Sequence, residues 1–371
     1  VNIRATVSDR DGISDVTLYY RVDEQQDTFT AVPMTADAAG NFAAEIPAQR
    51  NGDLVQFYVS STDTLGAEAV FPPKGPESRA LYKVDNTFSP DPLRHDFAIL
   101  MTDFDTDELH RNTNMLDNNR RGSTVIYNGT DAFYDVGTRL RGSMWTRDTL
   151  AETGYNLRFH PHELFRGVHN SVALDQKGKT EIFMKFVALQ SGNLGGTYDD
   201  VFNLQTPSGV AGGAVLAFLS RHTEMHQREQ FENGEEGTLF KFEGVRVMTT
   251  TSDRRDPESL KLFQPIGWVS SFDIQDLGHS KELYRWPFLI NRNRAKDDYG
   301  PLIEMAKAFS LEGRELQDRV DELMDMDSWA HTFAIMSLLG IGDAYSQGNP
   351  HNLNMFVRPS DGKILAFPWD W

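Results

Sequence analysis

The chain has 371 residues, no cysteine and a formal net charge of −18. A sequence without cysteine excludes disulfide scaffolds, zinc ribbons, thiol nucleophiles and iron–sulfur sites. The negative charge argues against nucleic-acid partners, and no stretch approaches the roughly 18 apolar residues that a membrane helix needs. The length predicts two or three domains, and a start at Val1 without methionine predicts a piece of a longer polypeptide.

Residues 1–86 are predicted to form a small all-β module. Apolar and polar residues alternate with a period of two over 16–22 and again over 55–60, which is typical of half-buried strands. Turn signals separate the strands at Asp11-Gly12, Gly40-Asn41, Asn51-Gly52 and Leu65-Gly66. This spacing predicts an immunoglobulin-like sandwich. Residues 9–21 also resemble the immunoglobulin-like modules of large bacterial surface proteins.

A change in composition after the first module predicts a domain boundary. Prolines gather at positions 72, 73, 76, 90 and 92, so we place a linker at 87–94. Strand-like segments follow at 97–101, 123–127 and 135–141. Further on, apolar residues recur with helical spacing over 316–323 and 329–336, and Gly340 is expected to end the second helix. Residues 95–371 are therefore predicted to form one α+β domain.

The last 30 residues carry the most informative pattern. A helix ending near Leu339 is followed by a polar loop with Asp343 and Asn352, then a strand, a turn, a second strand and Asp370. Phosphotransferases of the protein-kinase kind have the same order of parts. A loop aspartate orients or deprotonates the acceptor, an asparagine binds metal, and a second aspartate chelates the Mg²⁺ that bridges the nucleotide phosphates. By pattern alone, a polar surface loop followed by a β-turn explains the segment equally well.

Three stretches resemble the CotH family, the spore-coat-protein-H-like atypical kinases of bacteria. Residues 134–143 resemble the family's Gly-x-Arg-x-Arg-Gly strand, and residues 237–242 resemble its Gly-x-Leu-Tyr-Lys segment. The loop from Asp343 to Asn352, together with the segment 367–370, resembles the closing Asp…Asn…Pro-Trp-Asp signature, which is the most specific of the three. The resemblance covers roughly residues 95–371.

The resemblance implies a kinase-like fold, binding of ATP with Mg²⁺ or Mn²⁺, and transfer of phosphate to Ser or Thr of a protein. It implies Asp343 as the catalytic-loop carboxylate and Asn352 and Asp370 as metal ligands, with Asn349 and Asn354 as alternatives to Asn352. The cations left to face the phosphates are Arg139, Arg141, Arg158 and Lys241. The implied partner is a protein substrate or a surface protein, and the implied location is secreted or at the bacterial cell surface.

The chain departs from the family at two places. The family shows a basic pair ahead of an aromatic-containing strand, where this chain has Glu152, Thr153 and Gly154. The family also carries a glutamate after a glycine-rich stretch, and residues 209–218 lack it. These departures keep a second hypothesis open. In it, the kinase-like domain is catalytically inactive and serves as a scaffold or binding module in a surface, adhesion or structural protein.

Metal ligands are also suggested by two acidic segments and one histidine pair. Asp9 and Asp11, and separately the run 103–108, offer oxygen ligands for a structural Ca²⁺. His222 and His226 are four residues apart, as two zinc ligands on a helix would be. For the two acidic segments the favoured interpretation is a solvated loop, and for the histidine pair it is a solvated helix face.

Overall fold

The contacts within the chain divide it into two compact units. Unit 1 comprises Val1–Lys179 and Asp200–Leu219, and unit 2 comprises Thr180–Asp199 and Ser220–Trp371. The structure, a computed structural model, describes residues 1–23, 26–37, 40–86, 89, 91, 93–142, 147, 153–176, 178, 180–192, 195–210, 212–222, 224–244, 246–248, 261–263, 273–285, 287–349 and 351–370. In these ranges no helix is long and apolar enough to span a membrane. The predicted boundary at 87–94 stays a prediction.

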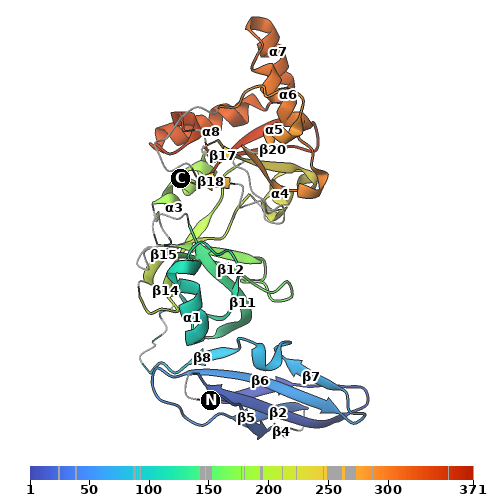
Figure 1. Ribbon diagram of the computed structural model, residues 1–371, viewed down its shortest axis with the longest axis vertical. Helices are drawn as coiled ribbons and strands as arrows, with labels where there is room; N and C mark the ends of the chain where they lie inside the picture. Colours follow the sequence, from blue (N-terminus) through green and yellow to red (C-terminus); the bar gives the residue numbers. More distant parts are fainter. Residues whose placement is uncertain are drawn as a thin grey trace. The chain divides into compact units, whose positions relative to one another are not determined.

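The first part of unit 1 is all-β in its described residues. Its strands are β1 (Asn2–Thr6), β2 (Ile13–Val22), β3 (Thr30–Pro33), β4 (Thr35–Ala36), β5 (Asn41–Glu45), β6 (Leu54–Asp63), β7 (Glu68–Phe71) and β8 (Leu81–Lys83), with a 3-10 turn η1 (Gly75–Glu77). One sheet has the order β1-β5-β4, and the other has the order β3-β2-β6-β7 with β8 also paired to β6 (Figure 1). Leu18 and Val55 are fully buried in the core of this part. The period-of-two pattern therefore marks the buried faces of β2 and β6.

The second part of unit 1 is a closed seven-stranded barrel. Its strands are β9 (His95–Leu100), β10 (Arg121–Tyr127), β11 (Asp131–Arg141), β12 (Gly154–Arg158), β13 (Ser171–Asp175), β14 (Asp199–Gln205) and β15 (Gly212–Phe218). They close in the order β10-β11-β12-β13-β15-β14-β9, and β14 pairs with β9 in parallel. The predicted strands at 97–101, 123–127 and 135–141 coincide with β9, β10 and β11. The closure of the barrel was not predicted.

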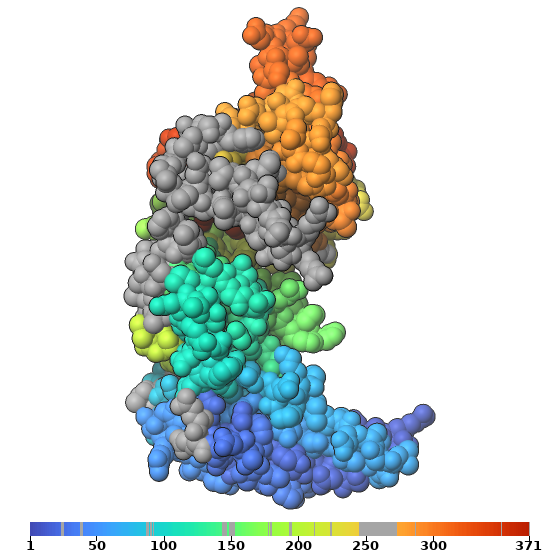
Figure 2. Space-filling view, in the orientation of Figure 1, coloured from blue at the N-terminus to red at the C-terminus, as the bar shows by residue number. Residues whose placement is uncertain are grey.

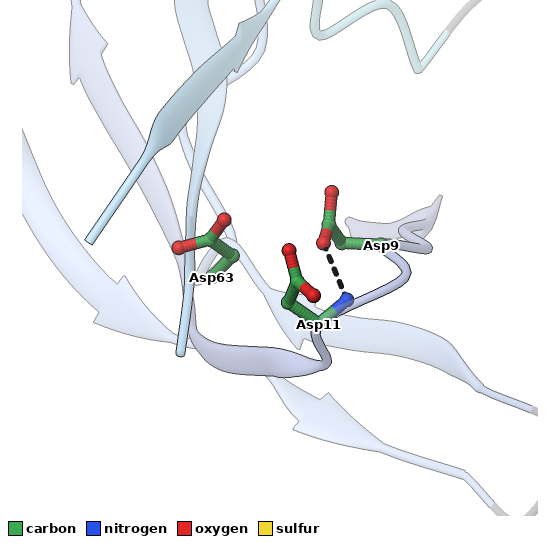
Figure 3. A group of neighbouring side chains, drawn as sticks. All are labelled: Asp9, Asp11 and Asp63. Atoms are coloured by element: carbon green, nitrogen blue, oxygen red, sulfur yellow. Dashed lines mark hydrogen bonds between the residues drawn. The ribbon is translucent and has the colours of Figure 1, made fainter. Parts of the chain in front are cut away.

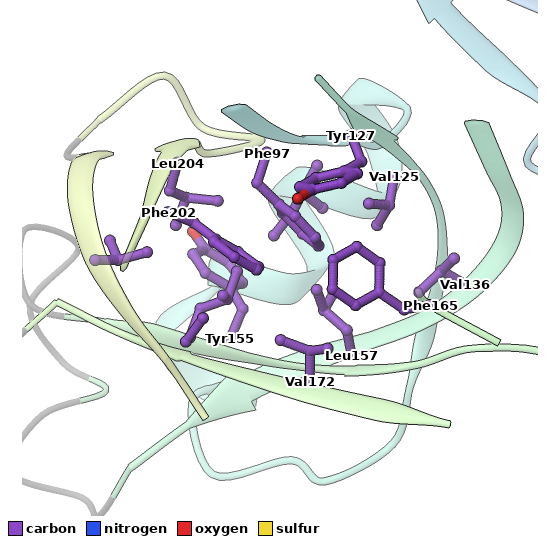
Figure 4. Close-up of a cluster of buried hydrophobic side chains, with 14 of the residues drawn as sticks. Phe97, Val125, Tyr127, Val136, Tyr155, Leu157, Phe165, Val172, Phe202 and Leu204 are labelled. Carbon is purple, nitrogen blue, oxygen red and sulfur yellow. The ribbon is translucent and has the colours of Figure 1, made fainter. Parts of the chain in front are cut away.

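Aromatic and aliphatic side chains fill the barrel (Figure 4). Phe97 and Phe202 stack inside it with their ring centroids 5.3 Å apart, and Phe165 meets both edge-on. Tyr155 and Leu157 point inward from β12 and are almost fully buried. Because alternate residues of a strand face opposite sides, the residues between them point out of the barrel. The interior is a packed core, so a ligand has to bind to the outer face or to the loops.

The acidic segment at 103–108 is a helix, which corrects the predicted loop. Helix α1 (Asp103–His110) begins after Thr102, whose hydroxyl oxygen accepts a hydrogen bond from the backbone N–H of Asp105 and so caps the helix; a 3-10 turn, η2 (Asn112–Asn114), follows the helix. Acidic residues favour this position because they face the positive end of the helix dipole. Asp105 is also buried and forms an ion pair with Arg79 at 2.5 Å. The run therefore has a structural role that needs no Ca²⁺.

Unit 2 is built around one antiparallel sheet with the order β19-β16-β20-β21. Its strands are β16 (Thr238–Glu243), β19 (Phe288–Arg292), β20 (His351–Val357) and β21 (Ile364–Pro368), and a separate pair is β17 (Arg246–Met248) with β18 (Lys261–Phe263). Its helices are α3 (Glu181–Gln190), α4 (Glu224–Gln230), α5 (Lys281–Tyr284), α6 (Gly300–Ala308), α7 (Gly313–Leu323) and α8 (Met326–Leu338), with 3-10 turns η3 (Gly234–Glu236), η5 (Arg294–Lys296) and η6 (Tyr345–Gln347). The predicted helices coincide with α7 and α8.

Helices cover one face of this sheet, and the other face carries a second buried apolar cluster, which includes Leu239 and Phe356, beside polar residues. Trp329 of α8 donates a hydrogen bond from its ring nitrogen to the Ile364 carbonyl of β21, at 2.9 Å. Phe242 and Leu353 lie in the core beneath the helices. Their strand neighbours therefore face the opposite side. Helix α7, orange at the tip of unit 2 in Figure 2, has no buried residue and takes little part in this core.

Close packing explains the glycine at the start of the segment 237–242. A Cβ atom placed on Gly237 would lie 2.2 Å from the ring of Phe356 and 2.7 Å from the carbonyl oxygen of Val357. Real Cβ atoms do not approach other atoms so closely, so β20 packs here only against a residue without a side chain. The glycine of this motif therefore holds β16 against β20, the strand that carries Asn352.

Candidate functional site

The polar loop after α8 brings Asp343 and Asn352 together. Gly340 has a left-handed φ of 71° and ends the helix, as predicted. The Asn352 side-chain amide donates a hydrogen bond to the Asp343 carbonyl at 2.8 Å and lies 3.4 Å from its carboxylate. Nε2 of His351 is 2.9 Å from the same carboxylate. The Asp343 side chain is nevertheless 62% exposed, so an acceptor molecule has access to it.

The three candidate asparagines have different surroundings. Asn349 donates to the Gly342 carbonyl at 2.8 Å and lies 3.4 Å from the Asp343 carboxylate. Asn354 is on the inner part of β20 and instead donates to Nδ1 of His222 at 2.8 Å. Asn352 is buried and has its amide nitrogen turned to Asp343. In the described part of the chain, the structure shows no hydrogen bond to Oδ1 of Asn352, and Oδ1 of Asn354 is buried without a hydrogen-bond partner.

Asp370 follows β21 and lies within electrostatic reach of a buried ion-pair cluster on α3. Nζ of Lys185 is 3.1 Å from Glu181 and 2.7 Å from Asp199. Burial raises the pKa of Glu181, Lys185 lowers it, and the negative charges of Asp199 and Asp370 raise it again. The ammonium group therefore pairs with two carboxylates, and the charge of Asp370 acts on one of them, Glu181.

The donors on Asn352 and Asp370 suit a hard divalent ion. Mg²⁺ prefers carboxylate and amide oxygens, and these two side chains supply both kinds. Asn352 and Asp370 have left-handed φ values of 57° and 56°, a conformation that Asn and Asp tolerate better than most residues. By the chemistry of their donor atoms, the two predicted metal ligands fit Mg²⁺ or Mn²⁺.

Lys241 lies on the same sheet face as Asn354, its Cα partner on β20. It forms an ion pair with Glu243, and its Nζ atom lies 5.9 Å above the ring of Trp369, next to Asp370 in sequence. Of the four cations predicted to face the phosphates, Lys241 is the one in the same unit as Asp343 and Asp370. A phosphate that recruits Lys241 would have to compete with Glu243 for it.

The three predicted arginines belong to unit 1 and point out of the barrel. Arg139 and Arg141 are on β11, and Arg158 is on β12. Arg141 forms an ion pair with Asp175, and its guanidinium lies 4.0 Å from the ring centroid of Phe218. The three arginines belong to unit 1, whereas Asp343 and Asp370 belong to unit 2. Binding of nucleotide phosphates by these arginines therefore stays a prediction. Ser143 and Glu152, which bear on the resemblance, lie outside the described residues.

His222 and His226 are buried, which corrects the expectation of a solvated helix face. The ring of Phe367 packs against both, with centroids 4.9 and 5.8 Å away. Nε2 of His222 donates to the Gly195 carbonyl at 2.7 Å while its Nδ1 accepts from Asn354, so the ring is neutral and both nitrogens are occupied. His222 thus positions Asn354 and offers no nitrogen to a metal.

Unit 2 should lose stability as the pH falls below about 6.5 because of His222. Burial, aided by the charges of His226 and Lys185, lowers the pKa of His222 to about 3, while the Gly195 carbonyl opposes the shift. Between pH 6.5 and pH 3 the unfolded chain binds a proton that the folded chain does not. The free energy of unfolding therefore decreases by about 1.4 kcal/mol for each unit by which the pH is lowered.

Urea unfolding at pH 7 and pH 5 measures this effect. His222→Gln should remove about 2 kcal/mol of the difference between the two pH values. His162→Gln, which changes an exposed histidine, is the matched control and should leave the difference as in the wild type. Equal pH dependence in wild type and His222→Gln would contradict the assignment.

The acidic residues near the N-terminus meet a third carboxylate (Figure 3). Asp63, from the end of β6, joins Asp9 and Asp11, and one oxygen of each lies within 4.8 Å of the others. The Asp9 carboxylate accepts a hydrogen bond from the backbone N–H of Asp11 at 2.8 Å. Exposed acidic groups of this kind are common without an ion, so Ca²⁺ at this position stays a prediction.

Comparison with known proteins adds no assignment. No protein-family model matches the chain, and no curated protein matches it.

Proposed function

We propose that unit 2 is the catalytic part of an ATP-dependent phosphotransferase that acts on Ser or Thr of proteins. The proposal includes a CotH-like kinase domain over residues 95–371, preceded by an immunoglobulin-like module. The contact between Asp343 and Asn352 carries it, because this contact joins the loop after α8 to the start of β20. Asp370 follows the next strand, in the order that phosphoryl transfer uses.

Each residue of this group has a proposed role. The exposed Asp343 carboxylate orients the acceptor hydroxyl and takes up its proton. Asn352 and Asp370 hold the divalent metal through oxygen atoms, and the metal, when bound with ATP, neutralises phosphate charge. Lys241 faces the phosphates, and the buried Lys185 holds Glu181 in place beside Asp370.

One observation favours the second candidate, a catalytically inactive kinase-like domain that acts as a binding module. A Cβ atom on Gly154 would lie 2.4 Å from the Leu174 carbonyl oxygen, so no lysine fits at this end of β12. The family has a basic pair before this strand. At Gly154 the contact with the Leu174 carbonyl leaves no space for such a side chain. In either case we propose a secreted or cell-surface protein with a protein partner.

Binding of Mn²⁺ with ADP tests the proposed centre before any acceptor is known. Asp370→Ala should weaken Mn²⁺ binding, measured by electron paramagnetic resonance, by at least about tenfold, because a charged oxygen ligand is lost. Asp361→Ala is the matched control, since Asp361 lies in the β20–β21 turn and pairs with Arg358. Equal Mn²⁺ affinity in wild type and Asp370→Ala would contradict the proposal.

A further inference from the structure

Four arginines crowd together on the outer face of the barrel. We call Arg120, Arg139, Arg147 and Arg158 the arginine patch. Strands β11 and β12 are neighbours in the barrel (Figure 1). Arg139 is the Cα partner of Asn156, and Arg158 is the partner of Gly137. Because inward and outward residues alternate and Leu140 and Leu157 are inside, Arg139 and Arg158 point outward on neighbouring strands.

Arg120 contacts both of these strands and is held by neutral oxygens. Its guanidinium donates to the Gly137 carbonyl at 2.8 Å, to the Asn156 carbonyl at 2.7 Å and to the Asn156 side chain at 2.6 Å. A Cβ atom on Gly137 would lie 2.9 Å from Cδ of Arg120. The glycine therefore provides the space in which Arg120 rests.

Asn118 ties two further arginines together. Its side-chain oxygen accepts from Arg139 at 3.0 Å and from Arg147 at 3.1 Å. Arg147 also donates to the Gly142 carbonyl at 2.8 Å. The amide fixes the two guanidinium groups side by side but leaves their charge in place.

The patch is not neutralised by carboxylates in the part of the chain that the structure describes. None of its four members forms an ion pair there, whereas the neighbouring Arg141 pairs with Asp175. Burial lowers the pKa of Arg120 to about 10, and the charges of Arg139 and Arg158 add to the effect. Burial and the charge of Arg139 also lower the pKa of Arg147, which Asp117 partly offsets. The positive charges of the arginine patch thus repel each other, although the protein as a whole has more acidic residues (54) than basic ones (36).

We propose that the arginine patch binds the phosphoryl groups of a small anion, such as pyrophosphate or the diphosphate of a nucleotide. Guanidinium groups match phosphate oxygens in geometry and bind them through pairs of hydrogen bonds. The ligand would remove the repulsion that the cluster otherwise carries. This site lies within unit 1. It goes beyond the proposed function, and beyond the phosphate-facing roles that the resemblance implies for Arg139 and Arg158, because it includes Arg120 and Arg147 and requires neither metal nor phosphate transfer.

Titration of the full chain with inorganic pyrophosphate in EDTA tests the site by calorimetry. Arg139→Gln and Arg158→Gln should each weaken binding by at least tenfold. Arg4→Gln is the matched control, because Arg4 is exposed on β1 of the same unit and the substitution removes the same charge. This variant should change the affinity for pyrophosphate less than about twofold. Unfolding midpoints in phosphate-free buffer identify variants that fail to fold.

The outcomes separate this site from the proposed catalytic centre. Asp370→Ala should bind pyrophosphate as the wild type does, whatever its effect on Mn²⁺ binding. A parallel titration with ADP shows whether the anion is carried by a nucleotide. The inference is overturned if wild type does not bind either anion, or if Arg4→Gln weakens binding as much as Arg139→Gln.

Discussion

Replacing Lys185 by methionine should lower the free energy of unfolding of unit 2 by about 3–5 kcal/mol at pH 7. The side chains of Lys185, Glu181 and Asp199 are at most 6% exposed, so solvent does not screen their charges. Without the ammonium group, the buried charges of Glu181 and Asp199 lose the cation that stabilises them, and the negative charge of Asp370 adds to the effect on Glu181. Breaking a buried ion pair from one side has a cost of this size, because the remaining charge stays desolvated.

Two further variants identify the cause of this loss. Lys307→Met removes a lysine that pairs with Glu304 near the surface of α6, and it should cost less than about 1 kcal/mol. Adding Glu181→Gln and Asp199→Asn to Lys185→Met should recover most of the lost stability, because no uncompensated charge remains. Denaturant unfolding provides the measurement. A loss in Lys185→Met no larger than in Lys307→Met would contradict the buried cluster.

Asp343→Asn should reduce phosphate transfer by about 10²–10⁴-fold, the usual contribution of a positioned general base. The amide cannot take up the acceptor proton, but it is nearly the same size as the carboxylate. Binding of Mn²⁺ with ADP should therefore stay as in the wild type, which separates a catalytic effect from a loss of the metal site.

A matched control for this variant lies on α7. Asp318→Asn makes the same chemical change at an exposed position, and transfer should remain at the wild-type rate. Initial rates with labelled ATP give the comparison. If Asp343→Asn transfers phosphate as fast as Asp318→Asn, then Asp343 is not the base.

Local patterns predicted the elements but not how they assemble. Period-two alternation located β2 and β6, and helical spacing located α7 and α8, because each depends on residues a few positions apart. Closure of the barrel depends on the parallel pairing of β14 with β9, about 100 residues earlier in the chain. Nothing in the composition of either strand specifies its partner.

The candidate site was predictable to the same extent. Asp343 lies in the loop after α8 and Asn352 lies at the start of β20, nine residues later, and their contact follows from that short separation. Lys185 was missed because it sits in an otherwise apolar helical stretch, and Asp199, its closer partner, belongs to a later strand. The patch around Arg139 was likewise seen only in part, since Arg120 reaches it from a segment before β10.

Transfer of labelled phosphate from ATP to a Ser/Thr-rich protein, with Mg²⁺ or Mn²⁺, tests the central claim most directly. The account predicts that the wild-type chain labels the acceptor and that Asp370→Ala, which lacks a proposed metal ligand, labels it only at background. Equally low incorporation by both proteins, with no thermal stabilisation of either by nucleotide, would contradict the phosphotransferase and leave the binding module as the function of unit 2.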